Sequence, residues 1–229
     1  MAQLTLRQAH EADHAPIVAA IQTWWGDTRT PDEARELSLL LPRLFLQHFA
    51  ATSLILNEVG IGIEVKAEAE DPTPGGATGT TGVTLVTDVT DAGPGTSSAQ
   101  PTERIAGFLV GFHSPDRPGT AYIHFVGVHP KLRHQGVARQ LYERFFAQAA
   151  AAGRQEVRAI VSPANKPSIA FHRAMGFEPD AGDYESNGVP VHRDYDGPGH
   201  DRISFRRLLA VPPTATGATG ATSTATAPG

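Results

Sequence analysis

The 229 residues of this chain predict an α/β fold in which helices flank a single mixed β-sheet. Short alternating or apolar segments, typical of strands, are interspersed with segments whose apolar residues recur at helical spacing. Hydrophobic residues make up 40% of the chain, which is sufficient for one normal core. We therefore expect one folded domain over residues 1–210, with a low-complexity insertion inside it and a disordered tail at 211–229.

The N-terminal part is expected to alternate between strands and helices. In chain order, the predicted elements are a strand at 4–9, a helix at 13–25, a helix that begins at 30 or 31, and a strand at 53–58. Asp13 is the candidate N-cap of the first helix. Pro42 should kink the second helix or divide it, because proline removes a helix hydrogen bond.

Residues 60–103 differ in composition from both flanking parts. Thr, Gly, Ala, Pro and Asp dominate this stretch, so it can bury little apolar surface. We predict a long disordered insertion between two hairpin strands. Ordered elements should resume after it as strands at 104–112 and 121–128, a helix at 136–152, a strand at 156–161, a helix at 166–175 and strands from 177 and at 202–209.

Composition excludes several classes of protein. The net charge of −5 argues against a general nucleic-acid binder, which usually presents a basic face. The chain has no cysteine, which excludes disulfides, thiolate zinc sites and a cysteine nucleophile. No apolar run approaches the length that spans a bilayer, and the N-terminus lacks a signal core. We expect a cytoplasmic protein that binds neither membranes nor nucleic acid, and we predict no metal site.

The segment Val126–Gly136, VGVHPKLRHQG, is the most informative part of the chain. It predicts a strand, a tight turn and a helix start, where unpaired N–H groups and the helix dipole favour anions. Gly136 would let the backbone approach a ligand closely, and Arg133 would add a fixed positive charge. Together these features predict a site for a pyrophosphate.

This segment resembles the signature of the GCN5-related N-acetyltransferase (GNAT) superfamily, Arg/Gln-x-x-Gly-x-Gly/Ala after a strand that ends in Val-x-Pro. The matching residues are Arg133, Gly136, Ala138 and Val128-His129-Pro130. A second block, Asn165–Ser168 followed by Phe171–Phe177, resembles the family's later Asn–helix–Gly-Phe segment. The resemblance covers about residues 104–178 well and, by element order, residues 1–58.

The resemblance implies a mostly antiparallel GNAT-type sheet and an acetyl-CoA-dependent N-acetyltransferase. A primary amine, from a small molecule or a peptide, would attack the thioester directly in a ternary complex. Family members are often homodimers, although no residue here points to a dimer interface. The implied acetyl-CoA contacts are Val126, Gly127, Val128, Arg133, His134, Gln135, Gly136, Val137, Ala138, Asn165, Ser168, Phe171 and His172.

The resemblance also suggests how the strand and the second helix would serve the reaction. The strand at 123–128 would splay from the next strand, and the pantetheine arm would fill the gap. Gly127 is consistent with a bulge or a close backbone approach. The Val128 N–H is the candidate that polarises the thioester carbonyl. Asn165 would reach the pantetheine arm, or it would simply cap the helix.

Two histidines are candidates for proton transfer. His172 stands where many family members have a tyrosine as general acid, and phosphinothricin-type acetyltransferases resemble this chain in having histidine there. It would protonate the leaving thiolate, or it would only pack against CoA while water is the acid. His124, expected on one strand face with Tyr122, Val126 and Val128, could be the base for the amine. The alternative for His124 is a core histidine bonded to backbone.

Two groups of residues are candidates for binding the acceptor. Trp24, Trp25 and Asp27 lie at the end of the first helix, which borders the acceptor pocket in the family. Asp194 and Asp196 belong to an acidic loop that could attract an amine. Core packing by a tryptophan and a solvated loop are the alternatives.

Three other functions compete with a small-molecule acetyltransferase. A non-catalytic acyl-CoA-binding or sensory module would keep residues 133–138 but lack a working acid. A protein or peptide N-acetyltransferase would need an open groove near the acidic loop. A protein-interaction domain would not bind CoA at all.

Overall fold

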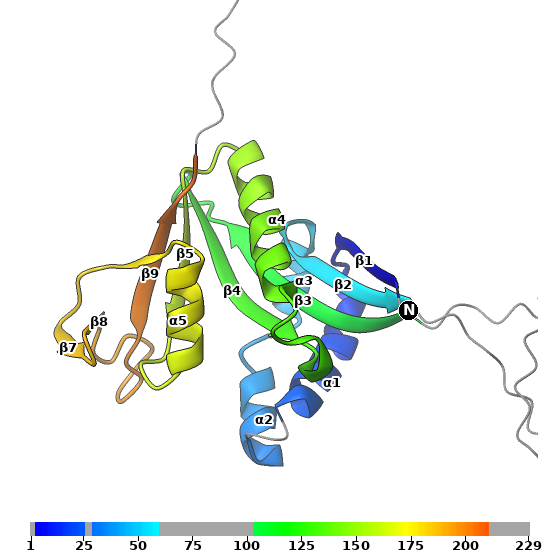
Figure 1. Cartoon of the computed structure of the whole chain (residues 1–229), viewed down its shortest axis with the longest axis horizontal. Helices are drawn as coiled ribbons and strands as arrows, with labels where there is room; N and C mark the ends of the chain where they lie inside the picture. Colours follow the sequence, from blue (N-terminus) through cyan, green and yellow to red (C-terminus); the bar gives the residue numbers. More distant parts are fainter. Residues whose placement is uncertain (1–2, 26–28, 60–102, 211–229) are drawn as a thin grey trace, which may run out of the picture.

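The computed structural model describes residues 3–25, 29–59 and 103–210. The tail and nearly all of the predicted insertion lie outside these residues. The described part confirms the predicted α/β fold, with one mostly antiparallel mixed sheet between two layers of helices (Figure 1). No helix within it is long and apolar enough to cross a membrane.

Seven strands form the main sheet in the order β1-β2-β3-β4-β5-β9-β6. Their bounds are β1 Gln3–Gln8, β2 Leu54–Val59, β3 Glu103–His113, β4 Thr120–Val128, β5 Glu156–Val161, β6 Glu178–Pro179 and β9 Ile203–Leu208. Every neighbouring pair is antiparallel except β4 and β5, which run parallel. Each predicted strand bound lies within one residue of these bounds.

The helices also follow the predicted order, as α1 His14–Trp24, α2 Pro31–Ser38, α3 Leu44–Phe49, α4 Val137–Ala151 and α5 Lys166–Ala174. Thr30 caps α2 in a capping box with Glu33. Pro42 lies between α2 and α3, so it divides the predicted helix rather than bending it. Asp13 occupies the N-cap position of α1 without a side-chain cap bond, because its carboxylate pairs with Arg7 at 2.7 Å instead.

Each face of the sheet has its own core. On one face, α4 packs Leu141, Phe145 and Ala149 against the strands. On the other face, α1 and the segment through α3 pack Ile17, Ile21 and Leu46 against β2 and β3, around Phe108. The alternation of Leu54, Ile55 and Leu56 between the two cores explains why these strands are apolar on both sides.

A two-stranded hairpin within the predicted acidic loop was not expected from the sequence. It consists of β7 Tyr184–Ser186 and β8 Val189–Val191. Asn187 and Gly188 form its turn with φ of 51° and 71°. Both positive angles match a type I′ turn, for which Asn-Gly is the strongest short-range signal. Although the Asn-Gly pair is present in the sequence, its flanking strands have only three residues each and are too short to show a strand pattern.

Candidate active site

The strands β4 and β5 pair over only three positions and then separate. Their register joins Thr120, Ala121 and Tyr122 to residues 156–158. Beyond Tyr122, β4 continues along β3 alone, while β5 continues along β9. Figure 1 shows the two strands meeting at one end and spreading apart toward the other. The splay that the family resemblance implied for this strand is therefore present.

The separated part of β4 directs backbone groups toward the gap. The N–H of His129 donates to the Ala106 carbonyl at 2.9 Å, and Val128 lies opposite Gly107. Hydrogen-bonded and non-bonded pairs alternate along antiparallel strands, so Val128 belongs to a non-bonded pair, and so does Val126. Their N–H groups therefore point away from β3, toward the side where β5 has left the sheet. The role of the Val128 N–H as an oxyanion donor stays a prediction.

The turn before α4 presents a concave set of backbone N–H groups. His134 and Gly136 both have left-handed backbones, with φ of 61° and 80°. Alternating left- and right-handed residues form anion-binding concavities of N–H groups. A side chain at Gly136 would meet no atom within 4 Å, so the surface beside it is open to a ligand. Val137 and Ala138 begin α4, whose first N–H groups lack helical acceptors.

Arg133 does not direct its guanidinium group at this turn. Its Nη2 donates to the Trp24 carbonyl at 2.7 Å, and its Nε donates to the Val128 carbonyl at 3.4 Å. The group also lies over the Trp25 ring, 5.9 Å from its centroid. Arg133 thus ties the end of β4 to the C-terminus of α1, where a cation is favourable. The contact of Arg133 with a cofactor stays a prediction, as does the anion site at the turn.

The second block begins with an N-cap at the start of α5. The Asn165 side-chain oxygen accepts from the Ser168 N–H at 3.2 Å. This bond uses only the carbonyl end of the amide, so its NH₂ group remains able to donate. Both predicted roles of Asn165 are therefore compatible, although contact with a pantetheine arm stays a prediction. Phe171 lies half-buried on α5 against the Tyr142 ring.

His172 lies inside the core rather than on an open surface, with only 5% of its area exposed. Its Nδ1 lies 2.8 Å from the Ser168 carbonyl, so this nitrogen carries the proton. Its Nε2 then accepts from the Tyr142 hydroxyl at 3.2 Å. The ring stacks on Phe205. Burial lowers the pKa of His172, although the bond to Ser168 opposes the shift. His172 is therefore a neutral imidazole with both nitrogens engaged, and its predicted acid role remains untested.

A β-bulge changes the expected face of His124. The register pairs Val110 with Phe125 and Gly111 with Ile123, which leaves His124 as the extra residue. Val126 and Val128 consequently pack against the core beneath α4, whereas His124 stacks on Phe45 on the other face. The prediction that His124 shares a face with Val126 and Val128 was wrong, because a bulge inverts the alternation beyond it.

The bulge also lies away from Gly127, where the sequence suggested it. A side chain at Gly127 would collide with the Phe108 ring at 2.4 Å, so this glycine provides a close approach of backbone to ring. The Nε2 of His124 lies 2.5 Å from the Leu40 carbonyl and must therefore carry the proton. Burial lowers the pKa of His124, which leaves Nδ1 as its basic nitrogen.

Known proteins identify the domain. Residues 73–177 match the model of the Acetyltransferase (GNAT) family. The chain contains a GNAT acetyltransferase domain. An L-2,4-diaminobutyric acid acetyltransferase from Nocardia farcinica is 31% identical over 83 residues, which are 36% of this chain and 43% of that protein. The match thus spans less than half the length of this curated relative.

Solved structures show the same fold for the GNAT domain at low sequence identity. A protein described as an acetyltransferase of the GNAT family from Desulfovibrio desulfuricans has a TM-score of 0.55 and 18% identity, covering 91% of this chain and all of that one. N-acetylglutamate synthase from Neisseria gonorrhoeae, complexed with coenzyme A and N-acetyl-glutamate, has a TM-score of 0.52 and 14% identity. That similarity covers 92% of this chain and 36% of the synthase chain.

The two tryptophans expected at the acceptor side of the GNAT domain have different surroundings. Trp24 is 7% exposed and stacks on Phe108 in the core. Trp25 is half-buried and stacks on Phe125. Asp27 lies outside the described residues. The structure therefore gives Trp24 the core role that the sequence offered as an alternative.

The acidic loop of the GNAT domain uses its carboxylates internally. Asp194 accepts from the Gly199 N–H at 2.6 Å, and Asp196 pairs with Arg202 at 2.6 Å. Asp201 accepts from the Tyr184 hydroxyl at 2.5 Å. These bonds engage all three carboxylates inside the loop, although among the described residues only Asp196 has a positively charged partner.

Sequence analysis missed a cavity of about 280 Å³ on the face of β4 and β5 that is opposite α4. Arg117, Tyr122 and Arg158 line it together with Tyr195 from the acidic loop. These residues come from four segments, and no local motif connects them. A larger cavity of about 820 Å³ lies between α1 and the ends of β2 and β3. The smaller one adjoins the paired start of β4 and β5, where the gap opens.

Proposed function

We propose that the GNAT domain transfers an acetyl group from acetyl-CoA to a primary amine, by direct attack of the amine in a ternary complex. The observation that carries this proposal is the separation of β4 and β5 beside the open turn before α4. The gap offers strand-like N–H groups on Val126 and Val128, and the turn offers N–H groups for a pyrophosphate. The two features adjoin, as one extended ligand with an anionic end requires.

The comparisons support the cofactor. The synthase of the same fold is complexed with coenzyme A. In the present chain, residues 134–138 would hold the pyrophosphate, and the pantetheine arm would pair with β4. Residues Asn165, Ser168 and Phe171 would contact it from α5. This assignment uses the residues that the sequence predicted, except that Arg133 would act by holding β4 and α1 together.

The chemistry requires one bond to form and one to break at the acetyl carbon. Acetyl-CoA supplies an activated thioester. The Val128 N–H would donate to the thioester oxygen and stabilise the charge that develops there. The Nδ1 of His124 would take a proton from the amine, directly or through water. His124 is suited to this step because its low pKa keeps Nδ1 unprotonated near neutral pH.

The thiolate that leaves needs either a proton or solvent. We propose His172 as the source of that proton. In this structure its Nε2 accepts from the Tyr142 hydroxyl, so Nε2 would first take up a proton from solvent. The imidazolium would then donate to the Tyr142 oxygen while the Tyr142 hydroxyl passes its own proton to the thiolate. Burial holds the pKa of Tyr142 well above its ordinary value, so this hydroxyl is protonated at neutral pH. The alternative is that His172 only holds α5 in place and that water is the acid.

The bonding of His172 also favours one competing function. A histidine with both nitrogens engaged in the core is what a non-catalytic acyl-CoA-binding module would retain. A peptide acceptor is less well supported, because the cavity of about 280 Å³ matches a small molecule. The cytoplasmic location and the homodimer stay predictions.

Calorimetric titration with acetyl-CoA, followed by thiol release with a panel of amines, tests the proposal. We expect micromolar binding and amine-dependent release of CoA. Binding without release for any amine would favour the non-catalytic module. An absence of binding, in the presence and absence of amines, would overturn the proposal.

A further inference from the structure

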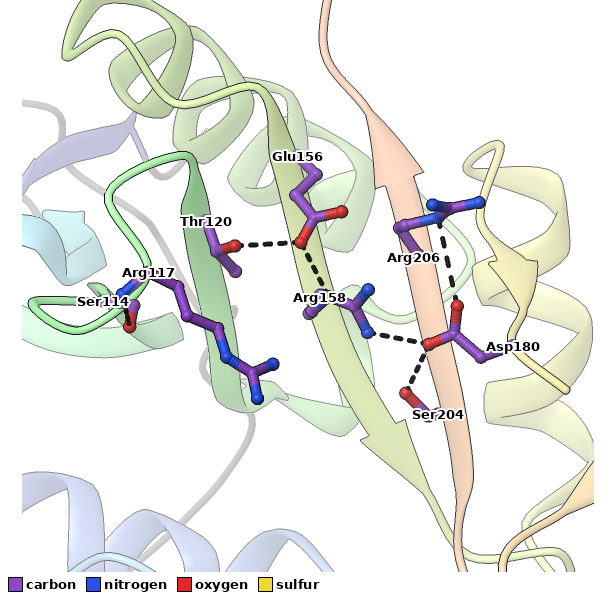
Figure 2. A network of polar contacts seen from close by, with 8 residues as sticks. All are labelled: Ser114, Arg117, Thr120, Glu156, Arg158, Asp180, Ser204 and Arg206. Carbon is purple, nitrogen blue, oxygen red and sulfur yellow. Dashed lines mark hydrogen bonds and ion pairs between the residues drawn. The ribbon is translucent and has the colours of Figure 1, made fainter. Parts of the chain in front are cut away.

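The sheet face that holds the smaller cavity carries a closed network of ion pairs (Figure 2). The Arg158 Nε lies 2.7 Å from Glu156, and its Nη1 lies 2.7 Å from Asp180. Hydroxyl groups complete the network, because Thr120 donates to Glu156 and Ser204 donates to Asp180. Arg206 adds a longer contact, with its Nε 3.9 Å from the Asp180 carboxylate, so each of the two carboxylates has an arginine partner.

The ionisation of this network is fixed by its own bonds. Burial raises the pKa of the Glu156 carboxyl, but bonds from Arg158 and Thr120 outweigh it and lower the pKa overall. The third nearby carboxylate, Asp196, pairs with Arg202 at 2.6 Å. Among the described residues, these three carboxylates are matched by three arginines, Arg158, Arg206 and Arg202, so the group carries no net negative charge.

Arg117 is the exception to this pairing. It lies in the turn between β3 and β4, where its backbone N–H donates to the Ser114 hydroxyl at 3.1 Å. Within the described part of the chain, its guanidinium group has no hydrogen-bond or ion-pair partner. Figure 2 shows its side chain reaching from the turn across the face of β4, apart from the paired network. Arg117 lines the cavity and is exposed, so it presents an uncompensated positive charge there.

The remaining lining groups are neutral. They comprise two apolar side chains and several hydroxyls, from Phe112, Ile160, Ser114, Thr120, Tyr122, Tyr195 and Ser204. Burial raises the pKa of Tyr122 above its ordinary value, so its hydroxyl is neutral at physiological pH. No described residue that lines the cavity is acidic. The cavity is therefore complementary to a small ligand with one negative charge.

We propose that the acceptor is a small aminocarboxylate whose carboxylate binds Arg117. The planar guanidinium fork matches a carboxylate with two parallel hydrogen bonds. One unpaired cation matches a singly charged group better than a phosphate ester. This inference rests on the proposed acetyl transfer. It also reverses the expectation from composition, in which an acidic loop would attract an amine.

The test compares acceptors that differ only in the carboxylate. The panel contains the common amino acids and L-ornithine, each paired with the amine that lacks the carboxylate, such as 1,4-diaminobutane for ornithine. Acetyl transfer is measured for the wild type, Arg117→Gln, Arg117→Lys and Arg144→Gln. Arg144 is an exposed arginine on α4, across the sheet, and serves as the charge-matched control.

We expect the wild type to prefer at least one aminocarboxylate over its partner amine by at least about tenfold in kcat/KM. Arg117→Gln should remove this preference, with a loss of about 10- to 100-fold for the aminocarboxylate alone. Arg117→Lys should recover part of it, and Arg144→Gln should match the wild type. The affinity for acetyl-CoA should be unchanged in all variants.

Several results would overturn the inference. Arg117 does not bind the acceptor carboxylate if the rates are equal on both members of every pair. The same follows if Arg117→Gln loses activity equally on both members. Transfer to amines but to no aminocarboxylate would also overturn the inference, as would acetyl-CoA binding with no transfer to any acceptor of the panel. Failure to bind acetyl-CoA is a different result, because it removes the proposed function itself.

Discussion

The two sites proposed beside β4 would recognise their ligands by different means. On the gap side, the proposed site consists of backbone N–H groups on β4 and at the start of α4, positioned by the positive φ of His134 and Gly136. On the sheet face opposite α4, the cavity is lined by side chains from β3, β4, β5, β9, the β3–β4 turn and the acidic loop. The first site depends on one local turn, and the second depends on how distant segments meet.

The two proposed sites should therefore respond differently to amino-acid substitutions. Every residue type except proline has the same backbone N–H group, so a backbone site can retain its ligand while most side chains change. A side-chain cavity can change its ligand with one substitution, as Arg117 illustrates. Under the proposed function, the cofactor side would tolerate substitutions, whereas the side chains of the acceptor cavity would determine which acceptor binds.

The largest effect is expected from Gly136→Asp, which tests the backbone side. The carboxylate would face the bound phosphates, and a left-handed backbone strains any residue other than glycine, by about 1 kcal/mol. We expect acetyl-CoA affinity to fall by more than about 100-fold in calorimetry.

Gly153→Asp is the matched control for this variant. Gly153 has φ of 77°, and a side chain there would meet no atom within 4 Å. It lies at the other end of α4, so the substitution carries the same strain away from the proposed site. Equal affinities in the two variants would show that the turn before α4 does not bind the cofactor.

The second effect concerns His172. His172→Phe keeps the ring against Phe205 but leaves the Tyr142 hydroxyl and the Ser168 carbonyl without their partner, which costs about 1–3 kcal/mol of stability. If His172 supplies the proton, kcat should fall at least about tenfold while the acetyl-CoA affinity stays within about twofold.

Tyr142→Phe separates catalysis from packing at this position. It removes only the hydroxyl that bonds Nε2 and should lower kcat as His172→Phe does. A stability loss with unchanged kcat in both variants would reduce His172 to a packing residue.

Sequence reasoning succeeded where the signal was local. The strand and helix order, the division at Pro42 and the open turn at Gly136 each follow from a few neighbouring residues. It failed where one residue changes the geometry of those that follow. The bulge at His124 inverted the expected faces of Val126 and Val128. No pattern in this strand distinguishes a bulge from regular alternation.

Pairing partners were also beyond the sequence. The Arg133 guanidinium binds the Trp24 carbonyl, 109 residues away, and the Asp196 carboxylate binds Arg202. The sequence alone does not show whether a charged side chain has a partner or is free to bind a ligand. For the same reason Arg117, the one unpaired cation of the cavity, carried no signal in the sequence.

The third prediction concerns the pH dependence of stability, to which the buried histidines His124 and His172 should both contribute. Burial lowers the pKa of His124 and of His172 below the ordinary 6.5. The unfolded chain therefore binds more protons than the folded chain just below pH 6.5, and stability falls as the pH is lowered from 7 to 5. We expect a lower Tm at pH 5 and a smaller dependence in His172→Phe.

Salt distinguishes this cause from surface charge. Exposed ion pairs are screened at high ionic strength, whereas a desolvation penalty is not. The fall in Tm from pH 7 to pH 5 should therefore persist in 0.5 M salt, on the order of three times a physiological concentration. A Tm that is flat from pH 7 to 5 would contradict the burial of neutral histidines.

The smallest effect is expected from Asp196→Asn, which sharpens the contrast with Arg117. Arg202 already neutralises Asp196. The substitution therefore removes a partly exposed ion pair, and the fold should lose less than about 1 kcal/mol of stability. It also frees Arg202 beside the same cavity, so kcat/KM for an aminocarboxylate should change by less than about threefold and in the upward direction. A large loss for cationic amines instead, measured on the same acceptor pairs, would restore the acidic loop as the group that attracts the acceptor.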